Sequence, residues 1–441
     1  MRRSCLPLLL LGWTIAPAAT AGTAGEPPSR PGIDAPELAR LGAFAVGVRT
    51  MTLVHRDQPD VLAYDVQTGA APRRDRSLTV DIWYPAEARA GAIAESYTAT
   101  LPSEPPAPPA SFSIPGLAMR DAQPLAGRHP LIVVSHGYSN ATAALSWLTE
   151  NLASKGYVVA AIRHEDPPIG DRAKFPGPLL RRPLDIGFVT RSLQDTLGAE
   201  GLVDATRTGL VGYSMGGYGV LTSAGAALDP SGPSMQLVPG GLLLPYARGG
   251  TARDAVLVKG LKAVVAISPA GGALRAWGTD GLRDITAPLL LIAGDRDHTV
   301  DYTTGARAFF EAATGAERYL LTYRNGGHNL GLAPVPDTMR RRLWDLDWFE
   351  DPVWRKDRIV AINLHFITAF LDLHVRGDQS RSAYIDDLVA ESAAGSWLAD
   401  RPGPYDAVSP GTDGITVWKG FQRRHAEGLE LRHAMPRPQR D

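Results

Sequence analysis

The sequence predicts an α/β protein with a mostly parallel, doubly wound sheet and helices on both faces. From residue 130 onward, short apolar runs of strand length alternate with longer helical stretches, the pattern of a parallel sheet covered on both sides. Residues 46–54 and 78–85 alternate apolar and polar side chains, as strands with one solvated face do. The 441 residues and 44% hydrophobic content allow one large domain with a sizeable core.

The expected elements follow in chain order. Strands are expected at 131–134, 157–162, 208–211, 262–267, 289–293 and 319–323. Helices are expected near 141–155, 183–197, directly after residue 214, and near 303–313, 358–375 and 383–398. Insertions are expected at about 95–128, 165–182 and 229–258, and the last two are candidates for a lid. We find no linker-like break, so we expect one domain over 44–441 with a C-terminal extension at 335–441.

The N-terminus has the features of a secretory signal peptide over residues 1–21. A basic start precedes a short apolar stretch, and Ala19-Thr20-Ala21 is a small-x-small cleavage site. The apolar stretch is too short and too often interrupted by proline for a stable membrane span. We therefore expect a secreted or periplasmic protein, a flexible leader at 22–43, and no membrane span in the mature chain.

Net charge and cysteine content limit the kinds of partner, metal and covalent chemistry that are expected for the protein. The formal net charge is −1, so nothing global attracts nucleic acid or an anionic membrane. The only cysteine, Cys5, lies in the predicted signal peptide, which leaves the mature chain without a disulfide, thiol nucleophile or thiolate metal site. We expect no metal or cofactor, because the one acidic cluster is interpreted as solvated surface; it contains Asp345, Asp347, Glu350 and Asp351.

The strongest chemical signal is Gly212-Tyr213-Ser214-Met215-Gly216-Gly217. It fits G-x-S-x-G and stands between an expected strand and an expected helix, the context of an exposed nucleophile on a sharp turn. The glycines permit the strained turn, and the helix start offers N–H groups to developing negative charge. A serine without a chemical role in a glycine-rich turn is the alternative, and the context favours a nucleophile.

A base and an acid follow Ser214 in the chain. Gly326-Gly327-His328-Asn329 comes just after the last expected strand, and its glycines allow His328 to reach toward Ser214 as the base; the alternative is an exposed loop histidine. The stretch Gly294–Val300, GDRDHTV, offers Asp295 and Asp297 as the acid that orients this histidine. His298 directly follows Asp297 and is interpreted as a loop residue.

With these motifs the chain resembles the α/β-hydrolases. More narrowly, it resembles the bacterial predicted dienelactone hydrolases and the serine-dependent platelet-activating factor acetylhydrolases. The similarity covers about residues 44–376, and its most specific run is LASKGYVVAAIRHED at 152–166. Further matching runs lie at 76–86, 130–140, 182–193, 211–219, 262–272 and 288–300. The resemblance implies an α/β-hydrolase fold with antiparallel N-terminal strands, and hydrolysis of short or oxidised acyl esters without metal or cofactor.

The resemblance also implies roles for individual residues. It places the oxyanion hole at the backbone N–H groups of Tyr138 and Met215. Many family members write the acid segment as G-x-x-D, which selects Asp297 as the acid and leaves Asp295 to stabilise the turn. His136, in Ser135-His136-Gly137-Tyr138, is expected to brace the oxyanion loop instead of acting as the base. The Tyr138–Met215 pairing also resembles bacterial cutinases and polyester hydrolases, many of which carry a disulfide.

Two departures from the family limit what is carried over. In the animal platelet-activating factor acetylhydrolases the acid ends the strand after the nucleophile helix, where this chain has Ile267-Ser268-Pro269. True dienelactone hydrolases use a cysteine nucleophile, whereas Ser214 stands here. We expect a serine carboxylic-ester hydrolase that forms an acyl-enzyme on small or short-acyl esters, lipids included. The alternatives are a cutinase or polyester hydrolase, a serine amidase or peptidase, and a non-catalytic binding protein on a hydrolase scaffold.

Overall fold

The computed structural model describes residues 27–437 apart from 90, 105, 387, 397–414 and 423. The predicted signal peptide lies outside the described residues. The strands are β1 (Ala45–Pro59), β2 (Arg73–Ala86), β3 (Ser96–Leu101), β4 (Ala110–Pro115), β5 (Met119–Arg120), β6 (His129–Ser135), β7 (Val158–Arg163), β8 (Val203–Tyr213), β9 (Leu261–Ile267), β10 (Leu289–Gly294), β11 (Arg318–Tyr323) and β12 (Leu429–Ala434).

The helices follow the same numbering. The α-helices are α1 (Ser146–Ser154), α2 (Pro176–Ala199), α3 (Met215–Ser223), α4 (Pro233–Gln236), α5 (Ala308–Ala312), α6 (Leu343–Asp347) and α7 (Lys356–Leu371). Two π-helical turns are η9 (Thr303–Arg307) and η12 (Asp372–Arg376). The 3-10 turns are η1 (Glu37–Ala39), η2 (Val61–Ala63), η3 (Thr142–Leu145), η4 (Arg172–Lys174), η5 (Pro239–Gly241), η6 (Leu244–Tyr246), η7 (Arg253–Ala255), η8 (Gly281–Asp284), η10 (Asn329–Gly331), η11 (Asp337–Arg340), η13 (Gln379–Tyr384) and η14 (Ser392–Ala394).

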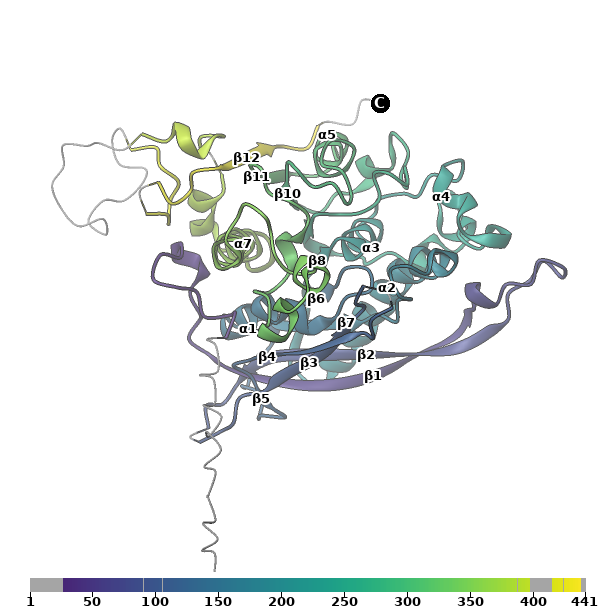
Figure 1. Cartoon of the computed structure of the whole chain (residues 1–441), viewed down its shortest axis with the longest axis horizontal. Helices are drawn as coiled ribbons and strands as arrows, with labels where there is room; N and C mark the ends of the chain where they lie inside the picture. Colours follow the sequence, from purple (N-terminus) through teal and green to yellow (C-terminus); the bar gives the residue numbers. More distant parts are fainter. Residues whose placement is uncertain are drawn as a thin grey trace, which may run out of the picture.

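A ten-stranded sheet forms the centre of the molecule (Figure 1). Its strand order is β12-β11-β10-β9-β8-β6-β7-β2-β1-β5. The six strands from β7 to β11 in this order are parallel to one another, whereas β2 and β12 are antiparallel to their neighbours. The predicted α/β class with a mostly parallel sheet is therefore confirmed, and the carboxyl ends of the parallel strands meet at one edge.

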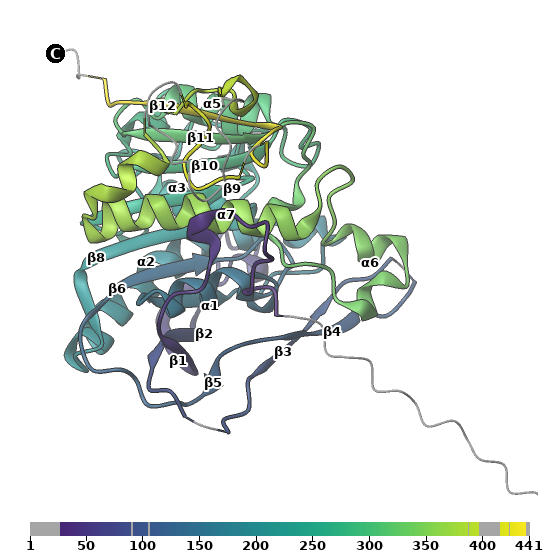
Figure 2. The ribbon, with the colours of Figure 1, turned by 90° about the vertical axis from the view of Figure 1, so that its left-hand side faces the viewer.

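Strand β6 illustrates why the sheet is covered on both faces. Ile132 and Val134 belong to the core shared with α1 and α7, whereas Leu131 and Val133 belong to the core shared with α2, α3 and α5. Successive side chains of a strand point to opposite faces, so a strand buried on both sides is apolar at every position. Figures 1 and 2 show α1 and α7 together on one face, with α2, α3 and α5 on the other.

Helix α2 begins at Pro176, seven residues before the predicted start at Pro183. Proline is favoured in the first helical turn, and Pro176 occupies that place, whereas Pro183 lies inside the 24-residue helix. Because Pro183 has no N–H, the carbonyl of Leu179 lacks its usual partner four residues on. The hydroxyl of Tyr218 in α3 donates to this carbonyl at 3.0 Å, which compensates for the missing bond.

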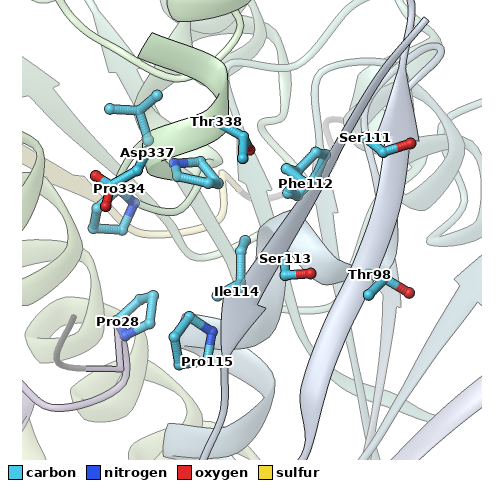
Figure 3. A pocket seen from close by; sticks show the side chains of 12 residues that line it. Pro28, Thr98, Ser111, Phe112, Ser113, Ile114, Pro115, Pro334, Asp337 and Thr338 are labelled. Atoms are coloured by element: carbon cyan, nitrogen blue, oxygen red, sulfur yellow. The ribbon is translucent and has the colours of Figure 1, made fainter. Parts of the chain in front are cut away.

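The insertion predicted at 95–128 has more structure than expected. It contains the β3–β4 hairpin, in which Phe112 and Ile114 are buried at alternate positions of β4. Figure 3 shows this hairpin facing the segment that carries Pro334, across a hollow of about 410 Å³. The sequence did not predict these two strands, because the prolines around residue 105 hid the two short alternations on either side.

The predicted helix near 383–398 is also wrong. Its described residues form part of η13 and the short η14, separated by extended chain. The backbone there pairs with the unpredicted strand β12 instead: Leu431 N–H donates to Ala390 O at 2.9 Å, and Ser392 Oγ donates to Leu429 O at 2.7 Å. Tertiary pairing thus overrides a local pattern that favours helix.

The described part of the predicted flexible leader, residues 27–43, is packed against the domain. Leu38 N–H donates to His365 Nδ1 at 3.2 Å, and Asn151 Nδ2 donates to Ala39 O at 2.9 Å. The composition of this segment suggested a loose chain, but side chains of α1 and α7 satisfy its backbone groups and hold it in place.

One stretch, Lys356–Arg376, is long and apolar enough to cross a membrane by length and composition alone. In its most apolar window 89% of the residues are buried inside the protein. This is the property of a core helix, and α7 with η12 covers one face of the sheet (Figure 2).

Glu150 of α1 joins three parts of the fold through one buried carboxylate. Its oxygens accept hydrogen bonds from Ser29 Oγ at 2.7 Å, Tyr97 Oη at 2.6 Å and Ala118 N at 2.9 Å. We predict that Glu150→Gln lowers the free energy of unfolding by about 1–3 kcal/mol, because an amide NH₂ would face groups that donate. Urea denaturation measures this loss, and the exposed Glu87→Gln is the control; equal stability of the two variants would contradict the prediction.

Candidate active site

Ser214 lies at the sharp turn between β8 and α3, in the strained conformation φ 53°, ψ −114°. The turn requires close backbone contacts that only glycine permits. A Cβ on Gly216 would lie 2.0 Å from the carbonyl oxygen of Ser135, and a Cβ on Gly212 would lie 2.3 Å from that of Gly216. Strain of this kind persists only where surrounding structure enforces it, and it clusters at functional sites.

The structure brings Ser214, His328 and Asp297 into one hydrogen-bonded line. His328 Nε2 lies 3.0 Å from Ser214 Oγ, and His328 Nδ1 lies 2.8 Å from Asp297 Oδ2. The other carboxylate oxygen of Asp297 accepts hydrogen bonds from the backbone N–H groups of Thr299 and Val300, at 2.9 and 3.1 Å. All three residues follow the carboxyl ends of strands β8, β10 and β11, as doubly wound sheets favour.

The other candidate groups of the GDRDHTV stretch lie elsewhere. Asp295 Oδ1 accepts a hydrogen bond from Asn325 N at 2.6 Å, so it ties the end of β10 to the loop after β11. His298 is exposed. Ser268, at the position where the animal acetylhydrolases carry their acid, is fully buried with φ 43°. Asp297 therefore contacts His328, whereas the other positions considered for the acid, Asp295 and Ser268, have different surroundings.

The two expected oxyanion donors border the same serine. Met215 is the first residue of α3, and the first N–H groups of a helix have no partner within it. The oxyanion loop, defined as residues 135–139, passes beside Ser214, since a Cβ on Gly137 would lie 3.5 Å from Ser214 Cβ. Tyr138 and Met215 both line the pocket at Ser214.

A buried ion pair that the sequence did not predict supports the oxyanion loop. Arg182 of α2 donates to the carbonyl of Gly137 at 3.1 Å and to that of His136, and it pairs with Asp166. Asp166 in turn accepts from Ser139 N at 3.0 Å. Arg182 and Asp166 are 16 residues apart, and each lies in a run that carries the family resemblance, which is the one signal that could have drawn attention to them.

His136 has the bracing geometry that the sequence predicted for it. Its Nδ1 lies 2.7 Å from Gly137 O, and its Nε2 accepts from His164 N at 3.0 Å, so Nδ1 carries the proton. Burial, reinforced by the positive charge of Arg182, lowers the pKa of His136 to about 4. The same two causes hold the pKa of His164 well below its usual value. Both imidazoles are neutral at ordinary pH.

A mostly apolar pocket of about 290 Å³ opens at Ser214. Its wall includes Trp348 from the C-terminal extension, whose Nε1 donates to Pro102 O at 2.9 Å. The sequence did not predict Trp348 as a site residue, because it lies 20 positions beyond His328. The remaining lining residues are Gly137, Tyr138, Asn140, Ile169, Phe175, Tyr213, Met215, Ala270, Gly271, Ala273, Leu274, Thr299, Val300, His328 and Asn329.

The interpretation of the acidic cluster as solvated surface is wrong for Asp345 and Asp351, which are buried because their carboxylates accept hydrogen bonds from neighbouring chain. Asp345 accepts from Ser103, and Asp351 accepts from the N–H of Gly327 at 2.6 Å. Within the described residues, a group with metal-ligand atoms inside 4.8 Å of one another is Glu317, Asp386 and His433. Glu317 precedes β11, at the opposite end of the parallel strands from Ser214, and the Tyr319 hydroxyl contacts both carboxylates.

The neutral histidines under the oxyanion loop predict acid sensitivity. A histidine whose pKa is about 4 in the folded protein and about 6.5 in the unfolded chain binds its proton more readily when unfolded. Its contribution to stability is therefore complete above pH 6.5 and is lost as the pH falls toward 4. We predict that His136→Gln flattens the dependence of unfolding free energy on pH in this window, measured by denaturant titration at several pH values. The exposed His298→Gln should keep the wild-type slope; equal slopes for both variants would contradict the prediction.

Comparison with known proteins finds similarity to a PET hydrolase-like family model and to cutinases. Residues 123–231 match the family model PETase, described as PET hydrolase-like. Cutinase est1 of Thermobifida alba is 25% identical over 198 residues, covering 45% of this chain and 52% of the cutinase. Cutinase est2 of the same organism is 27% identical over 181 residues, covering 41% of this chain and 46% of the cutinase. This chain thus spans about half the length of the curated relatives it matches.

A solved structure extends the similarity over more of the chain. The ferulic acid esterase from Streptomyces cinnamoneus superposes with a TM-score of 0.52 and 22% identity, covering 84% of this chain and 97% of that chain. At this identity the likeness concerns the fold. Together with the strand order and the turn at Ser214, it supports an α/β-hydrolase fold for this chain.

Proposed function

We propose that this protein is a serine-dependent carboxylic-ester hydrolase that works through an acyl-enzyme. The observation that supports this best is the hydrogen-bonded line from Asp297 through His328 to Ser214, with distances of 2.8 and 3.0 Å. The cutinase and PET hydrolase-like matches support the same reaction class.

The proposed reaction has two halves. His328 Nε2 accepts the proton of Ser214 Oγ while this oxygen attacks the ester carbonyl, and the N–H groups of Tyr138 and Met215 stabilise the oxyanion. Collapse of the intermediate breaks the ester bond, and His328 gives its proton to the leaving alcohol. His328 then removes a proton from water, which attacks the acyl-enzyme, and returns this proton to Ser214 Oγ as the bond to the acyl group breaks and the acid leaves. Asp297 keeps the proton on Nδ1 and stabilises the imidazolium in both halves.

The pocket supports a compact acyl or aryl group as the preferred substrate. Its volume of about 290 Å³ lies at the lower end of the range of small-molecule sites, which begins at roughly 300 Å³. Its aromatic wall, with Tyr138 and Phe175 in edge-to-face contact at 5.6 Å, suits a flat apolar group. Small esters, including those of short-acyl lipids, fit this proposal.

A polyester or cutin-like ester is the second candidate substrate. The match of residues 123–231 to the PET hydrolase-like model favours it. Ile169 lines the pocket and is 43% exposed, which leaves one wall of the pocket in contact with solvent. We further propose a secreted or periplasmic location, on the basis of the signal-peptide pattern at residues 1–21.

The choice of acid is testable by isosteric substitution. We predict that Asp297→Asn lowers kcat by about 10⁴-fold, because the amide no longer sets the histidine tautomer. Asp295→Asn is the matched control and should retain wild-type kcat on p-nitrophenyl acetate. Loss of kcat in the control together with an active Asp297→Asn would reverse the roles.

The reaction class is tested by a series of p-nitrophenyl esters of rising chain length. We expect the highest kcat/KM for short acyl groups, because the 290 Å³ pocket cannot enclose a long chain, and we expect Ser214→Ala to be inactive. Labelling by a fluorophosphonate without hydrolysis of any ester would favour an amidase or peptidase. Absence of labelling would favour a binding protein on this scaffold, and activity in Ser214→Ala would exclude the mechanism.

A further inference from the structure

The loop that carries His328 is held by the start of helix α7, which the proposed mechanism does not use. Gly327 N–H donates to Asp351 Oδ2 at 2.6 Å. On the other side of the histidine, Asn329 O accepts a hydrogen bond from Lys356 Nζ. The backbone immediately before and immediately after His328 is therefore held by two side chains of opposite charge.

Both side chains are removed from water at this place. Asp351 is 8% exposed and Lys356 is 5% exposed. Burial lowers the pKa of Lys356 to about 7, against the attraction of Glu350 and Asp351. Burying a charged group is unfavourable unless it is paired and hydrogen-bonded. Within the described residues, the hydrogen bond of Lys356 Nζ goes to the Asn329 carbonyl, so this buried amine serves the histidine loop.

The same carboxylate also shapes the turn into α7. Asp351 Oδ1 accepts from the N–H groups of Val353 and Trp354 at 2.9 and 2.7 Å, while its Oδ2 holds Gly327. The position of Gly327 is thereby tied to the turn that leads into α7. Because α7 is a buried helix of the core, its start is a rigid support for the loop.

A third contact continues this support beyond the histidine. Asn363, two turns into α7, donates from Nδ2 to Leu330 O at 2.8 Å and accepts from the hydroxyl of Tyr323 at 2.8 Å. The loop after β11 is thus bound before His328 to the turn that leads into α7 and after His328 to α7 itself. The imidazole contacts only Asp297 and Ser214 among the hydrogen-bond partners in the described chain.

We propose that Asp351 and Lys356 are positioning residues that set the orientation of His328 toward Ser214. This inference rests on the proposed function of the Ser214 site. Neither side chain lines the pocket, so each would act through the loop backbone and not on the substrate. A displacement of the base by about 1 Å can cost about 10²-fold in rate, and loss of either contact frees one side of the loop.

Three substitutions test the proposal. Asp351→Asn keeps the size of the side chain and an oxygen for the turn, but presents an amide to the N–H of Gly327. Lys356→Met removes the donor to Asn329 O, and Lys356→Arg retains a donor. Asp357→Asn is the matched control, because Asp357 is adjacent to Lys356 in the first turn of α7 but is exposed and pairs with Arg355.

The kinetic readout is kcat per active site titrated with a fluorophosphonate, which removes the effect of partial unfolding. We expect Asp351→Asn and Lys356→Met to lose about 10–100-fold in kcat with KM changed by less than about threefold. Lys356→Arg should recover most of the loss, and Asp357→Asn should match wild type. Wild-type kcat in folded Asp351→Asn and Lys356→Met would overturn the proposal, and if Lys356→Met does not fold, Asp351→Asn alone decides.

A second readout does not depend on turnover. The Nδ1 proton shared by His328 and Asp297 is expected as a low-field resonance in the proton NMR spectrum of wild type, absent in Asp297→Asn. We expect this resonance to shift or broaden in Asp351→Asn and to remain in Asp357→Asn. If wild type hydrolyses no ester and the resonance still responds, the proposed function fails and the positioning role stands. An unchanged resonance in both Asp351→Asn and Lys356→Met would overturn the positioning role.

Discussion

The site depends on one close contact between backbones, that of Gly216 with the carbonyl of Ser135. These two segments are the start of α3 and the end of β6, and no side chain fits between them. Their approach places Ser214 on a turn with φ 53° and brings the oxyanion loop beside it. The other features of the site lie around this contact. The acid follows β10, the base follows β11, and the pocket opens at Ser214.

Two buried basic side chains support the oxyanion loop and the His328 loop from opposite faces of the sheet. Arg182, on α2, holds the carbonyls of the oxyanion loop. Lys356, on α7, holds the carbonyl after His328. The sheet separates these helices (Figure 1), so the two supports are independent. The Arg182 guanidinium gains charge-assisted hydrogen bonds to backbone carbonyls in a medium of low dielectric constant, which offsets the loss of its hydration, whereas burial lowers the pKa of Lys356.

Site residues that are positioned by a short segment of the chain can be predicted from the sequence of that segment. Ser214 is evident because its glycines, strand and helix are all within ten residues, and His328 because its loop follows a clear strand. Asp297 is distinguished from Asp295 by the G-x-x-D motif of the family that the chain resembles. The two carboxylates have different partners in the structure. The parallel strands were predictable for the same reason, since a doubly buried strand is apolar at every position.

The supporting residues could not be predicted, because their partners are remote in sequence. Nothing near Arg182 indicates the carbonyl of Gly137, 45 residues away, and Trp348 enters the pocket from a region without strand–helix alternation. The helix predicted near 383–398 is wrong for a different reason. The apolar spacing of this stretch suits a helix, but its backbone pairs with β12. Pairing across long separations decides such segments, and periodicity carries no information about it.

Strand β12 affects how readily copies of the molecule can associate through their sheets. An exposed strand at the margin of a sheet offers unpaired N–H and C=O groups to any other chain, and proteins shorten or cover such margins to avoid aggregation. Here one margin ends in β5, which has two residues, and the other ends in β12, which pairs with the whole of β11. The chain at 390–392 occupies part of the outer side of β12, because Leu431 N–H donates to Ala390 O and Leu429 N–H donates to Ser392 Oγ. A chain that ends before Leu429 would present β11 as a template for intermolecular sheet growth.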